Sequence, residues 1–268
     1  MTATLTARGA ARSDPMKRLA RLGLAARAAI YLLIGILAIA LALGSPRGEA
    51  DQRGALQALT RHTGGTALVW VIAVGLAAYA LWRFSEAAFG VVGEGNKAVP
   101  RLQSFARGVI YTFFAVSAFT LLLQNSSSSQ AGQQAEFTAK TMRHTGGRWA
   151  VGIVGAVVVI CGLVLVWQGL TRSFEKYLNL GQMSPRTRRV VEFLGVFGTA
   201  ARGAVFALAG ALVIVAAVQY DPRKATGLDG ALRQLADSSS WSWLLYLIAA
   251  GLVVFGIYGF AEAKWRRT

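Results

Sequence analysis

Six apolar runs of about 20 residues dominate this sequence and limit what it can fold into. At 1.5 Å of rise per helical residue, a run of this length spans the roughly 30 Å hydrocarbon core of a bilayer. A soluble helical bundle would need charged stripes within these runs, and the runs lack them. The sequence therefore predicts an all-α, polytopic membrane protein with six transmembrane helices. The predicted spans are Leu24–Leu43, Thr66–Ser85, Phe105–Leu123, Trp149–Gly169, Ala200–Val218 and Trp241–Phe260.

The charged residues support this reading by their number and their position. They make up 15% of the chain, against about 25% in an average soluble domain. The net charge of +16 does not indicate a nucleic-acid partner, because the basic residues lie between apolar runs and not on a soluble, aromatic-studded face. Of the 28 Lys and Arg residues, 19 fall on the side of the two termini, which leaves nine for the other side. The positive-inside rule then predicts cytoplasmic N- and C-termini.

The chain contains an internal repeat. The pentapeptide Arg61–Gly65 (Arg-His-Thr-Gly-Gly) returns as Arg143–Gly147, each time just before an apolar run. A third copy aligns at an offset of 176, where Leu56–Glu86 matches Leu232–Glu262. Each unit crosses the membrane twice, so we expect three parallel two-helix repeats related by an axis along the membrane normal. The units are residues 22–90, 101–180 and 194–268, after a basic stretch, residues 1–21, that we expect to be disordered.

The connection inside each unit contains a short segment with helical periodicity. Leucines three residues apart, in Gly54–Leu59 and again in Gly230–Leu235, share one helical face. The middle connection has a weaker pattern, with Phe137 and Met142 as its apolar points. We expect three short amphipathic helices on the membrane surface.

Several motifs recur at equivalent places in the units. The odd-numbered helices share an Ala-Arg pair near their starts, ending at Arg27, Arg107 and Arg202. Phe-x-Glu-Ala motifs, Phe84–Ala87 and Phe260–Ala263, close the second and sixth helices. Together with the Gly-Ala-Leu surface segments, this pattern resembles the bacterial membrane proteins of the DUF1206 family (domain of unknown function 1206), in which a two-helix unit occurs three times. The likeness runs from about Leu19 to Arg267. It implies this fold and a bacterial inner (plasma) membrane location, but no activity.

Charged residues at one membrane level form the main candidate site. Arginine at a helix start and glutamate at a helix end both oppose the helix dipole, so ion pairing would relieve both. We expect Arg27–Glu86 and Arg202–Glu262 pairs within units, or equivalent pairs between neighbouring units. The network would act as a cytoplasmic gate or an anionic-substrate site. The alternative is static pairing, or snorkelling to phosphates and water. Its members are Arg27, Glu86, Arg107, Gln168, Arg202 and Glu262, where Gln168 replaces the carboxylate in the second unit.

The two histidines, His62 and His144, form a second candidate site on the outward side. Equivalent imidazoles could bind a metal or sense pH. The third unit has Ser238 there, which excludes a three-histidine site. The plainer interpretation is a turn, in which threonine caps the next helix and Gly-Gly relaxes the backbone. The single cysteine, Cys161, excludes an intramolecular disulfide and a cysteine-based metal site. We expect no cofactor.

Small residues recur at four-residue intervals, as in the stripe Gly203, Ala207 and Ala211 and in the pair Gly152 and Ala156. This spacing predicts close helix packing in lipid, and the lining of a pore is the alternative.

The sequence contains no nucleotide-binding, zinc-protease or serine-hydrolase motif, so we do not expect an enzyme. One remaining class is a structural, interaction or accessory component, with the bilayer and a membrane-protein partner or a second copy as its contacts. The other is a transporter or channel for a small solute, ion or lipid, with a pseudo-threefold axial pathway. A polar axial cavity reached by Arg27, Arg107 and Arg202 would favour transport. A tight interior or a broad side groove would favour assembly or lipid contact.

Overall fold

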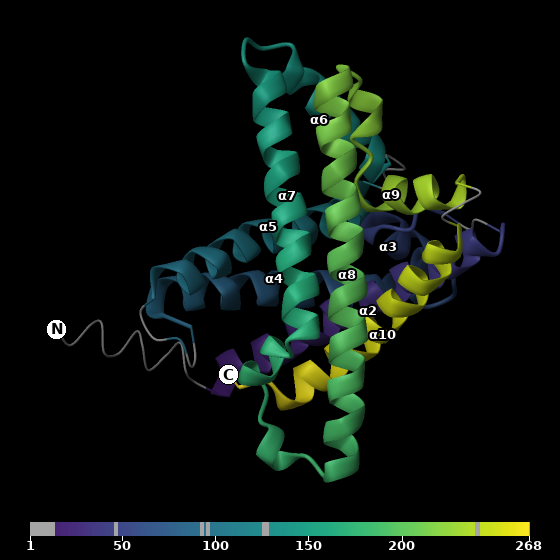
Figure 1. Cartoon of the computed structure of the whole chain (residues 1–268). Coiled ribbons are helices and arrows are strands. Elements are labelled where there is room, and N and C mark those ends of the chain that lie inside the picture. Colours follow the sequence, from purple (N-terminus) through teal and green to yellow (C-terminus); the bar gives the residue numbers. More distant parts are fainter. Residues whose placement is uncertain are drawn as a thin grey trace.

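The computed structural model describes residues 14–45, 48–91, 94, 97–124, 129–238 and 242–267. Within these ranges six helices are long and apolar enough to cross a membrane (Figure 1). They confirm the six predicted spans, although Trp241, the first residue of the last span, lies outside the described residues. The six are α2 (Asp14–Ala42), α4 (Gly65–Phe89), α5 (Ala98–Gln124), α7 (Gly147–Leu170), α8 (Pro185–Gln219) and α10 (Ser242–Trp265).

Helix α2 begins earlier than the hydropathy pattern suggested. We expected residues 1–21 to be disordered, and residues 1–13 lie outside the described residues. The prediction was wrong from Asp14 onward, because these residues form the first turns of α2. Asp14 suits the positive end of the helix dipole and pairs with Lys17 at 2.9 Å. Ala20 is fully buried, so this end of the helix is held by packing as well.

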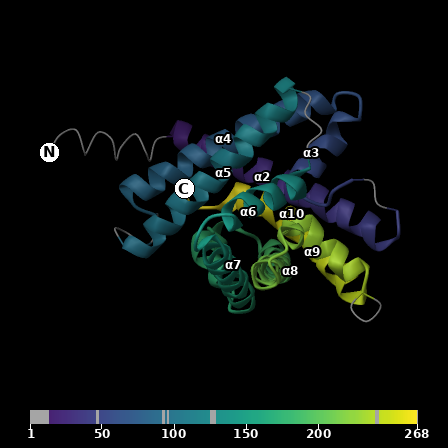
Figure 2. The same cartoon turned by 90° about the horizontal axis from the view of Figure 1, so that it is seen from above.

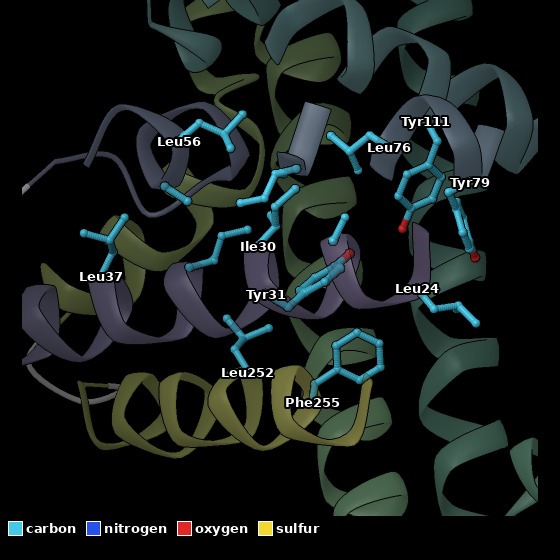
Figure 3. Close-up of a cluster of buried hydrophobic side chains, with 14 of the residues drawn as sticks. Leu24, Ile30, Tyr31, Leu37, Leu56, Leu76, Tyr79, Tyr111, Leu252 and Phe255 are labelled. Atoms are coloured by element: carbon cyan, nitrogen blue, oxygen red, sulfur yellow. The ribbon is translucent and has the colours of Figure 1, made fainter. Parts of the chain in front are cut away.

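Helix α2 occupies the centre of the molecule, between α4 and α10. Its apolar side chains Leu24, Ile30 and Leu37 are buried against neighbours that include Leu76 of α4 and Leu252 of α10 (Figure 3). The start of α2 and the end of α10 lie on one side of the molecule, which we call the terminal side (Figure 1). We call the opposite side the loop side, because the connections inside the units lie there.

The long helices pack mainly as three pairs, each joining the second helix of one unit to the first helix of the next. The pairs are α4 with α5, α7 with α8, and α10 with α2. Glycines allow the close approach: a Cβ at Gly162 of α7 would lie 2.4 Å from the backbone nitrogen of Ala207. A Cβ at Gly203 of α8 would lie 2.6 Å from the carbonyl oxygen of Gly162. The Gly203–Ala207 stripe therefore packs helices, as small residues at this spacing do in lipid.

The two helices of one unit cross at a second kind of contact, which only the first and third units form. A Cβ at Gly23 of α2 would lie 2.7 Å from the Cα of Tyr79 on α4. In the third unit, a Cβ at Gly198 of α8 would lie 2.5 Å from the Cα of Phe255 on α10. Each crossing therefore needs glycine where the two backbones meet.

The second unit lacks these glycines. Gln103 stands at the place of Gly23, and Val157 stands at the place of Gly75, whose Cβ would lie 2.6 Å from that of Ala26. Side chains of this size leave no room for the crossing, because a lone Cβ would already clash there. In the part of the chain that the structure describes, α5 and α7 do not pack against one another. The six helices therefore form an arc that is open between α5 and α7.

The helix pairs run in different directions and cross one another. Figure 1 shows α7 and α8 running side by side and crossing the α4–α5 pair steeply. Figure 2 looks nearly along α7 and α8, while α4 and α5 lie across the view. The three units thus make an open fan.

Three short helices on the loop side confirm the predicted amphipathic segments. The N-cap Asp51 accepts a hydrogen bond from the amide of Gly54 at 2.9 Å, and Ser129 caps the middle helix in the same way. Asp229 accepts the amide of Ala50 at 2.7 Å, which ties the third short helix to the first. These helices are α3 (Gln52–Thr60), α6 (Gln130–Met142) and α9 (Gly227–Ala236), and the 3-10 turns are η1 (Ser173–Tyr177), η2 (Leu180–Gln182) and η3 (Pro222–Lys224).

Candidate functional site: a side cavity that ends at buried arginines

A cavity of about 920 Å³ lies between α5 and α7, where the second unit lacks its crossing. This volume is near the upper end of the roughly 300–1,000 Å³ usual for small-molecule pockets. Phe113 of α5 and Val154 of α7 line it and are each 57% exposed, so the cavity opens sideways between these helices. Its other apolar walls come from α2 and α8, and include Ile34, Phe206 and Val213.

The loop-side rim of the cavity has uncharged polar side chains, beside apolar ones that include Phe137 and Leu228. The amide of Gln52 on α3 donates to the carbonyl oxygen of Phe114 at 3.4 Å, which orients one rim residue. The interior between the rim and the terminal side is lined by apolar side chains. The other rim residues belong to α6 and are Gln130, Gln133, Gln134, Thr138 and Thr141.

Arg27 reaches the cavity at its terminal-side end. Its Nη1 donates to the hydroxyl of Tyr79 over 3.3 Å, and its Nη2 forms an ion pair with Glu262. Its Nε is buried and has no hydrogen-bond partner among the residues that the structure describes. Tyr31 and Tyr111 line the cavity beside it, and Figure 3 shows their hydroxyls turned toward one another. This end of the cavity therefore has a guanidinium group beside two phenolic hydroxyl groups.

Glu262 links two arginines from different units. Besides Arg27 of the first unit, it forms an ion pair with Arg266, one turn further along α10. All three side chains are less than a tenth exposed. The pairing therefore joins α10 to α2 across the unit boundary, in a region where an unpaired charge is costly.

Tyr79 extends this network to α4 and α5. Its hydroxyl accepts a second hydrogen bond, from Arg83 at 2.5 Å. Arg83 also forms an ion pair with Glu86 at 2.7 Å, and Glu86 accepts a hydrogen bond from Ser104 of α5 at 3.0 Å. Four helices are thus joined on the terminal side by buried polar contacts.

The pairs expected within units do not form. Arg27 pairs with Glu262 of the neighbouring unit and not with Glu86, and Glu262 does not pair with Arg202. The reason lies in the packing, because α2 lies along α10 over much of its length but meets α4 near one crossing. The described residues therefore adopt the alternative arrangement, in which arginine and glutamate of neighbouring units form the ion pair.

Two of the three repeated arginines, Arg107 and Arg202, form no ion pair among the residues that the structure describes. The Arg202 guanidinium lies over the rings of Tyr31, Phe206 and Phe255, with its Cζ 5.1–5.2 Å from each ring centroid. Its Nε is buried without a hydrogen-bond partner. Tyr31 and Phe206 also line the cavity, so Arg202 contacts two residues of the cavity wall.

The repeat explains why Arg202 lacks a carboxylate. Rotating the Arg27–Glu262 pair through the three units places Glu86 beside Arg107 and Gln168 beside Arg202. Gln168 cannot neutralise a charge, and it forms no hydrogen bond or ion pair in the described part of the chain. The second unit therefore departs from the other two both at its crossing and at its carboxylate.

Sequence reasoning missed several members of the network. Arg83 and Arg266 counted only as orientation signals, and Tyr31, Tyr79 and Tyr111 were not singled out. A usable signal was the spacing of Arg83 from Glu86 and of Glu262 from Arg266, because residues three or four apart share one helical face. No sequence signal marked the tyrosines, whose roles depend on contacts between helices.

The two histidines are exposed turn residues. His144 Nδ1 lies 3.0 Å from the carbonyl oxygen of Lys140, and His62 occupies the equivalent turn of the first unit. The expected threonine cap was wrong, because the N-cap residues are Gly64 and Gly146, with φ of 79° and 80° and no side-chain cap. Glycine tolerates this left-handed conformation. No group of three metal-ligating side chains occurs in the described ranges.

Comparisons with known proteins agree with the repeat. The model of a family described as Domain of Unknown Function (DUF1206) matches three times, at residues 22–90, 102–172 and 197–266. An uncharacterised protein of Bacillus subtilis (strain 168), YxxB, is 29% identical over 254 residues, which covers 94% of this chain and 91% of the relative. No solved structure matches.

Proposed function

Because this chain belongs to the DUF1206 family, whose function is unknown, we propose its role from geometry: it binds a lipid-like amphiphile in the side cavity between α5 and α7. Binding here is a step of lipid handling or transport in the membrane, not of catalysis. The observation that carries the proposal is the missing crossing of the second unit. It leaves an apolar space of ligand size that opens in the direction of the surrounding lipid.

The orientation that we propose follows from charge. With 19 of 28 basic residues on the terminal side, the chain lies in a bacterial inner membrane with both termini in the cytoplasm. The polar rim on α3 and α6 then faces outward, and the Arg27 end of the cavity lies toward the cytoplasmic leaflet. An amphiphile would therefore lie along the cavity with its chain between α5 and α7.

The competing role is that of a structural or accessory component, in which a helix of a partner protein or of a second copy fills the same gap. Exposed apolar side chains on α7, such as Ile160, fit either role because they would also face lipid. Amides on the rim and an arginine at the far end favour a ligand with polar groups. An apolar helix would place only apolar side chains against these polar groups.

The test uses a neutral probe. Val158 of α7 lines the cavity, and Val158→Trp should fill it, whereas Ile160→Trp changes an exposed residue outside it. We expect saturable binding of oleyl alcohol to the purified wild-type protein, unchanged for Ile160→Trp and weakened at least tenfold for Val158→Trp. Equal binding by all three proteins, or no saturable binding by the wild type, would reject the proposal. A second protein chain retained by wild type and Ile160→Trp but lost from Val158→Trp would favour the structural role.

A further inference from the structure

We propose that the cavity selects an anionic head-group, a carboxylate or a phosphate, which binds to Arg202 together with Arg27 at the terminal-side end. This inference rests on the proposed function and names the chemistry of its ligand. The starting observation is that Arg202 has no carboxylate partner in the described part of the protein.

Arg202 lies inside a predicted membrane span, where a charge without a counter-ion is expensive. Its equivalent Arg27 has Glu262, but Arg202 has only aromatic faces around it. Stacking on rings offsets part of the desolvation cost, yet it leaves the N–H donors of the guanidinium, which lie in its own plane, without acceptors. The buried, unpartnered Nε of Arg202 is one such donor. An anion that accepts from this edge would supply the missing charge and the missing acceptor together.

Arg27 offers a second unused donor at the same place. Its two Nη atoms are engaged by Tyr79 and Glu262, while its Nε is buried without a partner and its side chain lines the cavity. The ring of Phe255 lies under both guanidinium groups, 5.6 Å from the Cζ of Arg27 and 5.1 Å from that of Arg202. Both cations therefore contact the same aromatic ring, and Tyr31, whose ring lies under Arg202, lines the cavity together with Arg27 and Tyr111.

The second unit departs from the other two in two ways that bear on this proposal. Gln103 and Val157 keep α5 and α7 apart and leave room for a chain. Gln168, in the same unit, leaves the opposing arginine without a carboxylate. Space for an acyl chain and an arginine without a carboxylate thus both follow from departures of the second unit, and an anionic amphiphile requires this combination.

The decisive comparison is between oleate and oleyl alcohol, which share a chain and differ in the charged head. Arg202 makes no hydrogen bond or ion pair in the described part of the chain, so Arg202→Gln removes a charge without breaking a contact of the network. Arg202→Lys keeps the positive charge but lacks the planar set of N–H donors of the guanidinium group. Arg186→Gln, on the exposed start of the same helix α8, is the matched control. Size-exclusion profile and thermal midpoint should show that all variants are folded.

We expect the wild type and Arg186→Gln to bind oleate about tenfold or more tightly than the alcohol, as charge-assisted hydrogen bonds allow. Arg202→Gln should reduce this ratio to near one, and Arg202→Lys should recover part of it. Equal binding of oleate and alcohol by the wild type would overturn the head-group proposal but leave the proposed function intact. Loss of alcohol binding in the Val158→Trp test is the separate criterion for that function.

Two further arms identify the source of the anion. Inorganic phosphate and butyrate carry the charge without a long chain. We expect neither to displace oleate at concentrations a hundredfold above it, because the apolar walls contribute most of the binding. Displacement by inorganic phosphate would instead assign the site to a free anion and reject the lipid head-group.

Discussion

At the scale of single residues, Tyr79 holds the terminal-side network together. Its hydroxyl accepts hydrogen bonds from Arg27 and Arg83, which belong to different helices. Both guanidinium groups are buried, so neither can turn to water if the acceptor is removed. The hydroxyl therefore stabilises two charged groups at once, beyond the ion pairs that each makes with a glutamate.

Removing this hydroxyl should destabilise the protein measurably. Tyr79→Phe leaves two buried charged donors without an acceptor, and we expect it to lower the free energy of unfolding by about 1–3 kcal/mol. Thermal unfolding in detergent, followed by circular dichroism, measures the change. Tyr246→Phe is the control, because that hydroxyl bonds one neutral carbonyl oxygen, of Ala42, at an exposed site. A loss for Tyr79→Phe no larger than that of the control would show that the network does not depend on Tyr79.

Asp51 on the loop side should give a dependence of stability on pH. Burial, together with the nearby carboxylates of Glu49 and Asp229, raises the pKa of Asp51 to about 7, against the opposing effect of the Gly54 amide. The folded protein thus favours the protonated form. This contribution to stability is fully present below the ordinary pKa of about 4 and is lost as the pH rises through about 7.

The measurement is the thermal midpoint of wild type and Asp51→Asn at pH 5 and pH 8. Asparagine keeps a capping oxygen for α3 but does not titrate. We expect the wild type to lose more stability than Asp51→Asn between these values. Parallel losses in the two proteins would mean that Asp51 does not titrate in this range.

At the scale of helices, packing depends on the places where a glycine faces a backbone. Gly162→Leu introduces a side chain where a Cβ alone would lie 2.4 Å from the Ala207 nitrogen, so α7 and α8 must separate. We expect it to lower the free energy of unfolding by about 1–3 kcal/mol or more. Gly181→Leu, at a position with nothing within 4 Å of an added Cβ, should leave the thermal midpoint unchanged. A similar loss for both would argue against glycine packing as the cause.

Helix existence was predictable from hydropathy, but helix ends were not. The fifth predicted span begins at Ala200, whereas α8 begins at Pro185. The added turns are polar and stand on local interactions: Ser184 caps the helix, Pro185 occupies its first turn, and Arg188 pairs with Glu192 at 2.6 Å. Hydropathy marks the part of a helix that contacts lipid. It does not mark helical turns that extend into water.

At the scale of the whole molecule, sequence predicted three units but not how they join. The repeat places each arginine level with several equivalent carboxylate positions, so composition and spacing alone leave the choice of partner open. The glycines decide it, because they determine which helices lie along one another. The side cavity was likewise hidden, since it follows from Gln103 and Val157 only when their glycine counterparts are known to form a crossing.

All six long helices are long enough to cross a membrane, but they differ in length. Helix α8 has 35 residues and α2 has 29, whereas α7 and α10, which pack along them, have 24 each. The additional turns at the start of α8 are polar and continue into water, so they do not add to its apolar span. About 20 residues are sufficient to cross the hydrocarbon core, so every helix of the fan meets this requirement.

The gap between α5 and α7 also bears on how fast a ligand could come and go. A carrier that encloses its cargo must rearrange before each release, and that motion sets its turnover. Here α5 and α7, as the structure describes them, do not cross, so a ligand would reach the cavity by lateral diffusion within the leaflet. The rate of exchange would then be set by the dissociation rate of the ligand, and so by the strength of the contacts with its head-group.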